Sequence, residues 1–579
     1  MEYIVQMIQN DQWEEAALAI MDKLESDTYD DMLAVLAATV NEHFGDTETF
    51  LLNIETGLKY NYQNYELYLM LGNYYAGFNS NQAFLCYENA EYYCKLNGSE
   101  EDLAYICQIK KTFEDTHNIT VRPYSFVILS YNTLDLTRDC IESIRRNCNL
   151  DTYELIVIDN ASKDGSVEWL REQKDIILIE NTENVGFPVG CNQGINAATL
   201  QNDIMLLNSD TIMMPNAMFT LRMCLYDSEQ NGMAGSVTNY AANNQVIECT
   251  FDSVEEYRQY AMKNNVPGEH KYEYKVWLIG FALLMKRTAL TQVGMLDERF
   301  TPGNYEDNDL GIRFLQKGFR NVLCWNSFIF HWGNKSFKQA GIQLYENIMQ
   351  VNREKYKEKW GISPTYYMNA RIDLMQLMQH DSQSSIRVLE IGCGAGVTLG
   401  RIQYCYPNAE VYGVELVDEV ASLGAVNFDI ICGNVESMDL PYEQEYFDYI
   451  IFGDVLEHLV NPALVLKKVR TYLKKDGYVL ASIPNLMNAE VIYSLLQGHF
   501  PYEEAGIRDE THLRFFTYHE IVKLFERTGY RIEAVMTTLL EGMTTDTYKN
   551  FFDQLLAIEG VADREFFDAY QYLVRARSC

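Results

Sequence analysis

The chain has 579 residues, 47% of them hydrophobic, and a formal net charge of −36. This length is too great for one hydrophobic core, and roughly three or four domains are expected. The acidic balance argues against nucleic acid or anionic lipid as a main partner, because phosphate groups are bound by clustered Lys and Arg. It does not exclude a nucleotide ligand, because a metal ion can bridge carboxylates to a diphosphate.

The thirteen cysteines include no C-x-x-C pair, so we expect reduced thiols and neither a cysteine metal site nor a disulfide framework. Residues 1–19 lack the basic and continuously apolar regions of a signal peptide. The sequence contains no run of about 18 apolar residues, so we expect no membrane span. These features predict a cytoplasmic protein.

Residues 1–118 show helical apolar spacing and contain no proline. Within them, Tyr68-x-x-Leu71-Gly72-x-x-Tyr75 is followed by a second helical pattern that contains Ala83 and Tyr87. The pair resembles a tetratricopeptide repeat, in which small residues let two helices approach and large ones fill the gap. We expect a tetratricopeptide-like helical region, and a helical bundle without repeats is the alternative.

From Tyr124 the pattern changes to short apolar strands at 126–129, 155–158, 176–179 and 204–207, with amphipathic helices between the first three. This pattern predicts a doubly wound α/β sheet, which binds ligands at the carboxyl ends of its strands. Polar residues follow each strand; any one of them alone could be a turn. The residues expected to bind a ligand there are Ser130, Asn132, Asp159, Asn160, Asp164, Asn184, Gly186, Asn192, Asn208, Ser209 and Asp210.

The segment 122–340 resembles inverting glycosyltransferases of family two, which have the GT-A fold. The resemblance implies that Asp159 contacts the base or ribose of a nucleotide-diphosphate sugar. Asn208-Ser209-Asp210 occupies the place of the family's Asp-x-Asp metal motif, with Asn in the first position. A Mg or Mn ion at Asp210 would neutralise the leaving diphosphate.

Further motifs of this family follow downstream. Inverting transfer needs a base for the acceptor hydroxyl, and the Asp of the family's Glu-Asp pair corresponds to Asp307, beside Glu306. The alternative is that Asp307 only begins a helix. His331, in Phe-His-Trp-Gly, corresponds to the closing His that meets the metal or diphosphate, although a structural role is equally expected. Gly280 completes the expected donor-binding residues.

A second α/β segment, 384–540, begins with a strand that runs through Glu390 into Gly392-Cys-Gly394-Ala-Gly396. A dinucleotide-binding turn is the rival, but it has the spacing G-x-G-x-x-G. G-x-G-x-G with an acid two residues earlier resembles the first motif of class I methyltransferases, where glycines let the backbone approach the methionine part of S-adenosylmethionine. Glu415, at the end of the next strand, is expected to accept the ribose hydroxyls.

The likeness continues through the segment. Asp454-Val-Leu-Glu-His458 and Asp509-Glu-Thr-His-Leu-Arg-Phe-Phe resemble the ubiquinone-biosynthesis-like small-molecule O-methyltransferases. Ser482-Ile-Pro-Asn lacks the signature of amino-methylating nucleic-acid enzymes, so oxygen is the expected acceptor. His458 would deprotonate the acceptor hydroxyl or only shape the pocket. The residues expected to hold the cofactor are Glu390, Gly392, Gly394, Gly396, Glu415, Asn434, Val435 and Asp454, with Asn434 where relatives often have Asp.

We expect a helical linker at 341–383 and a helical tail at 541–579 around these domains. The whole order resembles bacterial flagellin O-glycosyltransferases. This implies sugar transfer to Ser or Thr of a flagellin-like protein, which the N-terminal helices recruit, followed by methylation of the glycan. Three alternatives stay open: a rhamnosyltransferase and methyltransferase for polysaccharide or lipid-linked glycan, helices that mediate homodimerisation, and a scaffold with only one active domain.

Overall fold

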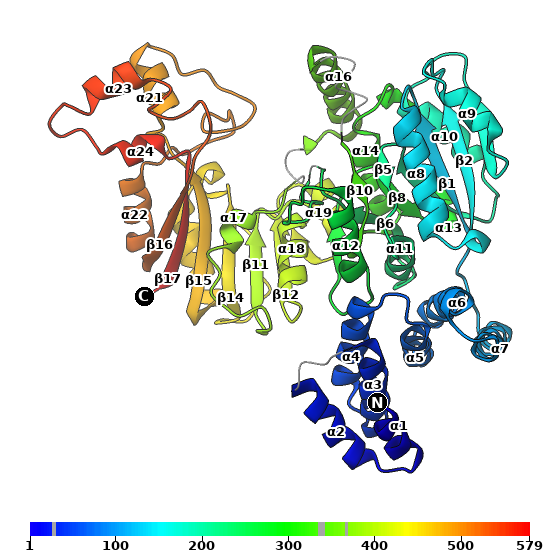
Figure 1. Cartoon of the computed structure of the whole chain (residues 1–579). Coiled ribbons are helices and arrows are strands. Elements are labelled where there is room, and N and C mark those ends of the chain that lie inside the picture. Colours follow the sequence, from blue (N-terminus) through cyan, green and yellow to red (C-terminus); the bar gives the residue numbers. More distant parts are fainter. Residues whose placement is uncertain (26–29, 242, 334–341, 365–368) are drawn as a thin grey trace. The chain divides into compact units, whose positions relative to one another are not determined.

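The computed structural model describes residues 1–25, 30–241, 243–333, 342–364 and 369–579 (Figure 1). The chain forms two compact units, Met1–Pro364 and Thr365–Cys579. Throughout the described ranges, no helix is long and apolar enough to cross a membrane.

The N-terminal region of the first unit is all-helical, as predicted. Its helices are α1 (Glu2–Gln9), α2 (Trp13–Glu25), α3 (Asp31–Phe44), α4 (Thr47–Tyr60), α5 (Tyr65–Tyr75), α6 (Ser80–Asn97) and α7 (Glu100–Thr116). Helices α3 to α7 each start at a residue whose side chain accepts a backbone N–H of the first turn: Asp30, Asp46, Asn64, Asn79 and Ser99. Helices α5 and α6 can approach closely because Gly72 has no side chain. A Cβ at this position would lie only 2.4 Å from the Tyr87 ring.

The helical region shares its hydrophobic core with the sheet domain that follows. Buried Leu85 of α6 and Phe219 of α11 (Ala217–Leu225) belong to one cluster of apolar side chains. The Phe219 ring meets the Tyr68 ring edge-on at 5.2 Å. Buried Arg222 of α11 forms an ion pair with Glu88 of α6. The two regions are therefore packed as one body.

The sheet of the first unit has eight strands in the order β3-β2-β1-β4-β8-β6-β9-β7. Its strands are β1 (Tyr124–Ser130), β2 (Tyr153–Asp159), β3 (Ile176–Glu180), β4 (Asp203–Asn208), β6 (Asn231–Val237), β7 (Tyr272–Lys275), β8 (Ala282–Met285) and β9 (Arg320–Phe328). Strand β1 pairs in parallel with β2 and β4, which brings the ends of these strands, Ser130, Asp159 and Asn208, to one edge. A small sheet joins β5 (Thr211–Ile212) to β10 (Phe330–His331).

The helices of this domain are α8 (Leu134–Asn147), α9 (Ser166–Glu172), α10 (Phe187–Ala197), α11, α12 (Val254–Asn264), α13 (Arg287–Val293), α14 (Glu306–Gln316) and α16 (Ile342–Trp360). The prediction that α16 belongs to a linker is wrong, because the helix packs on the first unit. Tyr356 is fully buried, and the indole N–H of Trp360 donates to Asp309 of α14 at 3.0 Å.

The second unit is a seven-stranded sheet in the order β13-β12-β11-β14-β15-β17-β16. Its strands are β11 (Arg387–Ile391), β12 (Glu410–Glu415), β13 (Asp429–Cys432), β14 (Phe447–Gly453), β15 (Leu473–Pro484), β16 (Tyr530–Thr538) and β17 (Gln571–Ser578). Its helices are α17 (Ile372–Met375), α18 (Val397–Cys405), α19 (Asp418–Gly424), α20 (Pro462–Val469), α21 (Ala489–Leu496), α22 (Tyr518–Arg527), α23 (Lys549–Leu555) and α24 (Arg564–Asp568).

The prediction of a helical tail at 541–579 is wrong for its last part. Strand β17 lies inside the sheet, antiparallel to both β15 and β16. The apolar run Tyr572-Leu-Val574 fits either a helix or a buried strand by periodicity alone. In the sheet, the backbone N–H and C=O groups of this run find hydrogen-bond partners on the strands at both sides. Its apolar side chains are also buried better there than they would be on a surface helix.

Candidate active sites of the two units

The edge formed by β1, β2 and β4 carries a buried carboxylate with spare acceptor capacity. Asp159 is fully buried at the end of β2, and its Oδ1 accepts the Ser162 backbone N–H at 2.8 Å. Its Oδ2 is buried and has no hydrogen-bond partner in the described parts of the chain. Because an unpaired buried acceptor is costly, this oxygen fits a ligand donor such as a base N–H or a ribose hydroxyl.

Several predicted site residues tie the loops of this edge together. Asn132 Oδ1 accepts the backbone N–H of Lys163 at 2.8 Å, and Asp164 accepts that of Leu134 at 2.8 Å. These bonds hold the loop after β1 against the loop after β2. The Ser130 hydroxyl, fully buried, bonds to Thr137 at 3.0 Å. In this structure these polar groups fix the shape of the edge.

The segment after β3 is arranged around Asn184. Its Oδ1 accepts the Asn160 amide at 3.2 Å and the Gly186 backbone N–H at 3.0 Å, which orders the start of α10. Asn192 does not join this group. Its amide donates to the Leu296 carbonyl at 2.9 Å and accepts the Leu296 N–H at 3.1 Å. Asn192 is thus engaged in packing α10, which favours a structural role for it.

The two predicted metal ligands, 121 residues apart in sequence, lie side by side. His331 Nε2 is 3.2 Å from Asp210 Oδ1, and both residues are buried. His331 Nδ1 lies 3.0 Å from the Tyr240 carbonyl, which can only accept, so Nδ1 carries the proton and Nε2 is left bare. Two acceptors then face each other, which requires a proton or a cation between them. Cis ligands of an octahedral Mg or Mn ion lie ~3 Å apart, so the pair fits such an ion.

Neighbouring residues and the rest of the metal motif hold this pair in place. The Asp210 carbonyl accepts the Trp332 backbone N–H at 2.9 Å, which joins the two segments. The Phe281 ring stacks on the His331 ring at 5.2 Å. Ser209 Oγ lies 3.4 Å from Thr133 Oγ1, and the Asn208 carbonyl accepts the Thr211 hydroxyl at 2.7 Å.

The predicted base lies in the first turn of α14. Asp307 Oδ2 accepts the Gly280 backbone N–H at 3.0 Å, so two predicted site residues come together. Burial raises the pKa of Asp307 above its ordinary value. Burial, and then the charge of Asp307, raises the pKa of Glu306 well above its ordinary value. The N-cap of α14 is Tyr305, so Asp307 is not the cap, although it does accept the Asn308 N–H at 2.9 Å.

A buried side chain that the sequence analysis missed supports this turn. Asn352 of α16 donates to the carbonyls of Phe300, Gly303 and Asn304 at 2.7, 2.8 and 3.3 Å. These residues immediately precede Glu306. The signal in the sequence was a polar residue on the apolar face of the helix that buries Tyr356, and the linker assignment hid it.

In the second unit, the glycine-rich turn and the acid after β12 form one structure. Gly392, Gly394 and Gly396 have φ of +70°, +55° and +80°, which side chains rarely adopt. Glu415 Oε2 accepts the Gly394 N–H at 2.9 Å, and its Oε1 accepts the N–H groups of Leu416 and Val417 at 2.8 and 2.9 Å. Three of about four lone-pair positions are thereby used.

An arginine that the sequence analysis missed lies at the centre of the same edge. Arg371 donates to Asp454 Oδ2 at 2.6 Å and to the Ser482 hydroxyl at 2.8 Å. The Asp454 Oδ1 accepts from Ser482 at 2.6 Å and from Gln571 of β17 at 2.9 Å. A lone Arg ahead of the first strand of the second unit carries no local pattern, so only the fold reveals it.

The remaining predicted cofactor residues are also placed. Burial raises the pKa of Glu390 to about 8, and its Oε2 has no hydrogen-bond partner within the described residues. Asn434 Oδ1 accepts the Glu436 N–H at 2.8 Å, and the carbonyl of buried Val435 accepts from Lys468 at 3.1 Å. His458, half-buried, has its ring 4.7 Å from that of His512.

Comparison with known proteins gives a family match for each of the two α/β domains. Residues 125–266 match the family described as Glycosyl transferase family 2, and residues 366–535 match a family described as Methyltransferase domain. The malonyl-[acyl-carrier protein] O-methyltransferase of Bacillus cereus is 22% identical over 173 residues, or 29% of this chain and 62% of that protein. A ubiquinone biosynthesis O-methyltransferase of Nitrobacter winogradskyi is 29% identical over 160 residues, or 26% of this chain and 58% of that one.

The chain thus spans less than two thirds of these curated relatives. A solved S-adenosylmethionine-dependent methyltransferase from Archaeoglobus fulgidus is 16% identical, with 38% of this chain and 98% of that one covered and a TM-score of 0.27. The chain is an enzyme that carries a family 2 glycosyltransferase domain and an S-adenosylmethionine-dependent methyltransferase domain.

Proposed function

We propose that the first unit transfers a sugar, with inversion, from a nucleotide-diphosphate sugar to an acceptor hydroxyl, using a Mg or Mn ion bound by Asp210 and His331. The observation that carries this proposal is the pair of facing acceptors, His331 Nε2 and Asp210 Oδ1, 3.2 Å apart. Such a pair fits a cation that neutralises a leaving diphosphate. Asp159 would hold the nucleotide through its unpaired Oδ2.

In this reaction Asp307 takes the proton of the acceptor hydroxyl at its carboxylate. The Gly280 N–H and the first turn of α14 hold that carboxylate in place. Burial and the charge of Asp307 raise the pKa of Glu306 further than that of Asp307, which favours a proton on Glu306 and the negative charge on Asp307.

We propose further that the second unit methylates an oxygen of the resulting glycan. S-adenosylmethionine, when bound at the turn 392–396, supplies an electrophilic methyl group. The unpaired Glu390 Oε2 fits the ammonium of the methionine part, and the last free position of Glu415 fits one ribose hydroxyl. The malonyl-[acyl-carrier protein] and ubiquinone biosynthesis relatives are O-methyltransferases, which supports oxygen as the acceptor.

The acceptor that we propose is a Ser or Thr hydroxyl of a flagellin-like protein. The helical region is fixed to the transfer domain through Arg222 and Glu88, so a protein held by these helices would have a defined position relative to the donor. Helix α7 offers a hollow of about 300 Å³ lined by Tyr105, Gln108, Ile109, Thr112, Phe113 and Thr116.

The test uses the full chain with a panel of nucleotide-diphosphate sugars and Mn. Donor hydrolysis is measured first, then label transfer to flagellin and to cell-surface polysaccharide, with mass spectrometry of the product before and after S-adenosylmethionine is added. We expect a protein-linked sugar that gains 14 Da per methyl group. Transfer only to polysaccharide would replace the proposed acceptor, and full transfer in excess chelator would refute the metal.

A further inference from the structure

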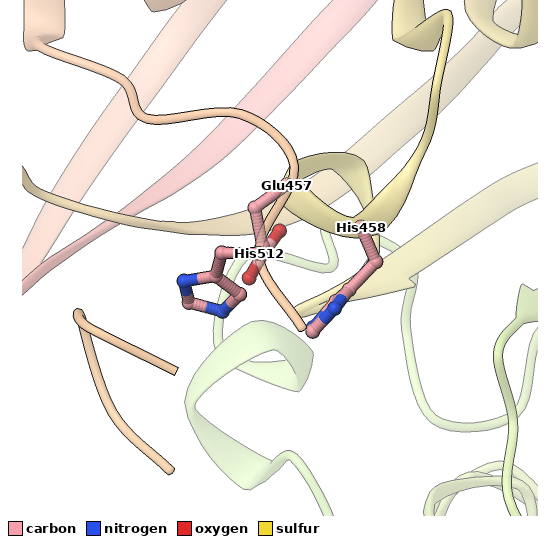
Figure 2. Close-up of side chains that lie close together, drawn as sticks. All are labelled: Glu457, His458 and His512. Atoms are coloured by element: carbon pink, nitrogen blue, oxygen red, sulfur yellow. The ribbon is translucent and has the colours of Figure 1, made fainter. Parts of the chain in front are cut away.

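A second group of potential ligands lies in the methyltransferase unit. Glu457 and His458 belong to the 3-10 helix η4 (Leu456–His458), which follows β14, and His512 lies in the loop before α22. One oxygen of Glu457 and one nitrogen of each imidazole lie within 4.8 Å of one another. Figure 2 shows the three side chains converging from these two segments.

Backbone hydrogen bonds hold the two segments together. The Glu457 carbonyl accepts the N–H groups of Leu513 and Arg514 at 2.9 and 3.0 Å. Glu457, which precedes His458 in η4, is therefore joined to Leu513, which follows His512 in the loop, in one fixed arrangement. The three side chains converge because the backbone brings them together, and not through chance contact of surface residues.

The hydrogen bonds of the two histidines determine which nitrogen is bare. The Thr511 hydroxyl donates to Asp509 Oδ1 at 2.6 Å, so toward His458 Nδ1, 3.1 Å away, it can only accept. His512 Nδ1 lies 3.1 Å from the Ile507 carbonyl, which also only accepts. Both rings thus carry their proton on Nδ1 and leave Nε2 unprotonated, the arrangement typical of metal-ligating histidines.

The carboxylate lacks any compensating partner. Glu457 is 1% exposed, and neither of its oxygens has a hydrogen-bond partner among the residues that the structure describes. Two bare imidazole nitrogens and one unpaired carboxylate therefore meet with no donor between them. A buried carboxylate in such surroundings either takes up a proton or binds a cation.

We propose that Glu457, His458 and His512 form a binding site for a divalent transition-metal cation, whose open coordination position receives the hydroxyl oxygen of the methyl acceptor. Two His and one Glu are the ligands of catalytic zinc sites that keep a fourth position open. Ligands of a tetrahedral zinc ion lie ~3.4 Å apart, so small side-chain rotations complete the site. His458 and His512 are half-buried, which leaves an entry path from solvent.

The role of the metal rests on the proposed O-methylation. A bound cation lowers the pKa of an oxygen ligand, so the acceptor hydroxyl loses its proton to water and keeps the electron pair on oxygen. In this arrangement His458 would be a ligand and not the base, and the proton of the acceptor hydroxyl would go to water.

Zinc alone is the probe, with no acceptor present, so that the metal site and the methylation can fail separately. The Asp210→Asn chain is used throughout, because this change removes the other proposed metal ligand set. After stripping with chelator, zinc binding is measured by calorimetry, and the zinc ligands are read by X-ray absorption. We expect one zinc per chain with two imidazole nitrogens and a carboxylate oxygen at about 2.0–2.2 Å.

Three further variants are compared in this background. Glu457→Gln and His512→Gln should each weaken zinc binding by at least about 100-fold, since changes outside the ligand shell already cost 10–100-fold. His499→Gln, the matched change at an exposed His of the same unit, should leave it unchanged. Retained S-adenosylmethionine binding identifies variants that are folded.

Either of two results overturns the proposal. The first is a stripped chain that takes up no zinc at micromolar concentrations, which would mean that Glu457 is simply protonated. The second is a zinc spectrum without two imidazole ligands, which decides the question even if both ligand variants fail to fold. Zinc binding without any O-methylation would refute the proposed function and leave the metal site standing.

Discussion

Glu390 offers the sharpest test of the methyltransferase site, because its burial disfavours the ionised form of the carboxyl group. Burial raises the pKa of Glu390 from 4.5 to about 8. The folded unit is therefore favoured fully below pH ~4.5 and loses stability as the pH rises toward about 8. At about 1.36 kcal/mol per pKa unit, this shift corresponds to roughly 5 kcal/mol. Glu390→Gln keeps the shape of the side chain and removes the ionisation.

The variant should therefore match the wild-type protein near pH 5 and exceed it near pH 8. For a domain of roughly 150–250 residues, a difference of roughly 5 kcal/mol raises Tm by about 10–20 °C. Calorimetry of the full chain measures this, and the transition that S-adenosylmethionine shifts upward identifies the second unit. The same variant should bind S-adenosylmethionine more weakly, because it cannot pair with the methionine ammonium.

Parallel Tm curves for the two proteins between pH 5 and 8.5 would show that Glu390 ionises as it does in the unfolded chain, and the reasoning from its burial would then be wrong. Thr398→Ala is a useful control, because the Thr398 hydroxyl bonds to the Glu390 carboxylate and favours its ionised form. Its removal should raise the pKa of Glu390 further, so the loss of stability should continue to higher pH and become larger in total.

Three further predictions concern the other site residues. Asp210→Asn should abolish sugar transfer and metal-dependent donor binding while leaving S-adenosylmethionine binding intact, as calorimetry on the full chain would show. Asp307→Asn should lower the transfer rate by ~10²–10⁴. It should also remove the acidic limb of the pH–rate profile, whose midpoint lies above 3.8 because burial raises the pKa of Asp307. Near wild-type turnover would exclude Asp307 as the base. Glu415→Ala should weaken S-adenosylmethionine binding by ~1.5–3 kcal/mol, and unchanged affinity would remove Glu415 from the site.

The sequence predicted both sheets because their inner strands are continuous apolar runs with polar residues at the carboxyl ends. That pattern placed Asp159 and Glu415 correctly at strand ends. The pairing of Asp210 with His331 follows from no local pattern, since 121 residues separate them, and only the resemblance to a family suggested it. The contact arises because β5 and β10 pair Thr211 with His331.

The misses have a common physical cause. Asn352, on the amphipathic helix α16, and Arg371, directly before the short helix α17, each act through one hydrogen-bonding side chain, and a polar residue at such positions is unremarkable. Their partners are backbone carbonyls or residues far along the chain, such as Ser482. Strand β17 was missed because its apolar run satisfies two periodicities at once. In each case the structure depends on hydrogen bonds or strand pairing between residues far apart in the sequence, and the local spacing of residue types does not reveal such contacts.

The shared core of the first unit decides how acceptor recruitment by the helices can be tested. Deleting residues 1–118 would uncover Phe219 and leave the buried Arg222 without Glu88. An unpaired buried charge alone costs about 3–5 kcal/mol, a large part of a typical domain stability of roughly 5–15 kcal/mol. Loss of transfer after such a deletion would therefore report unfolding as readily as lost recruitment.

Substitution on the exposed face of α7 separates the two effects. Tyr105 is 61% exposed and lines the hollow on this helix, so Tyr105→Ala should leave donor hydrolysis unchanged. If the hollow holds the protein acceptor, transfer to flagellin should fall at least about tenfold, the loss expected for one aromatic anchor worth ~1.4 kcal/mol or more. Tyr60→Ala, the same change at a 62% exposed residue of α4, is the matched control. Equal transfer by the two variants, with equal hydrolysis, would show that α7 does not select the acceptor.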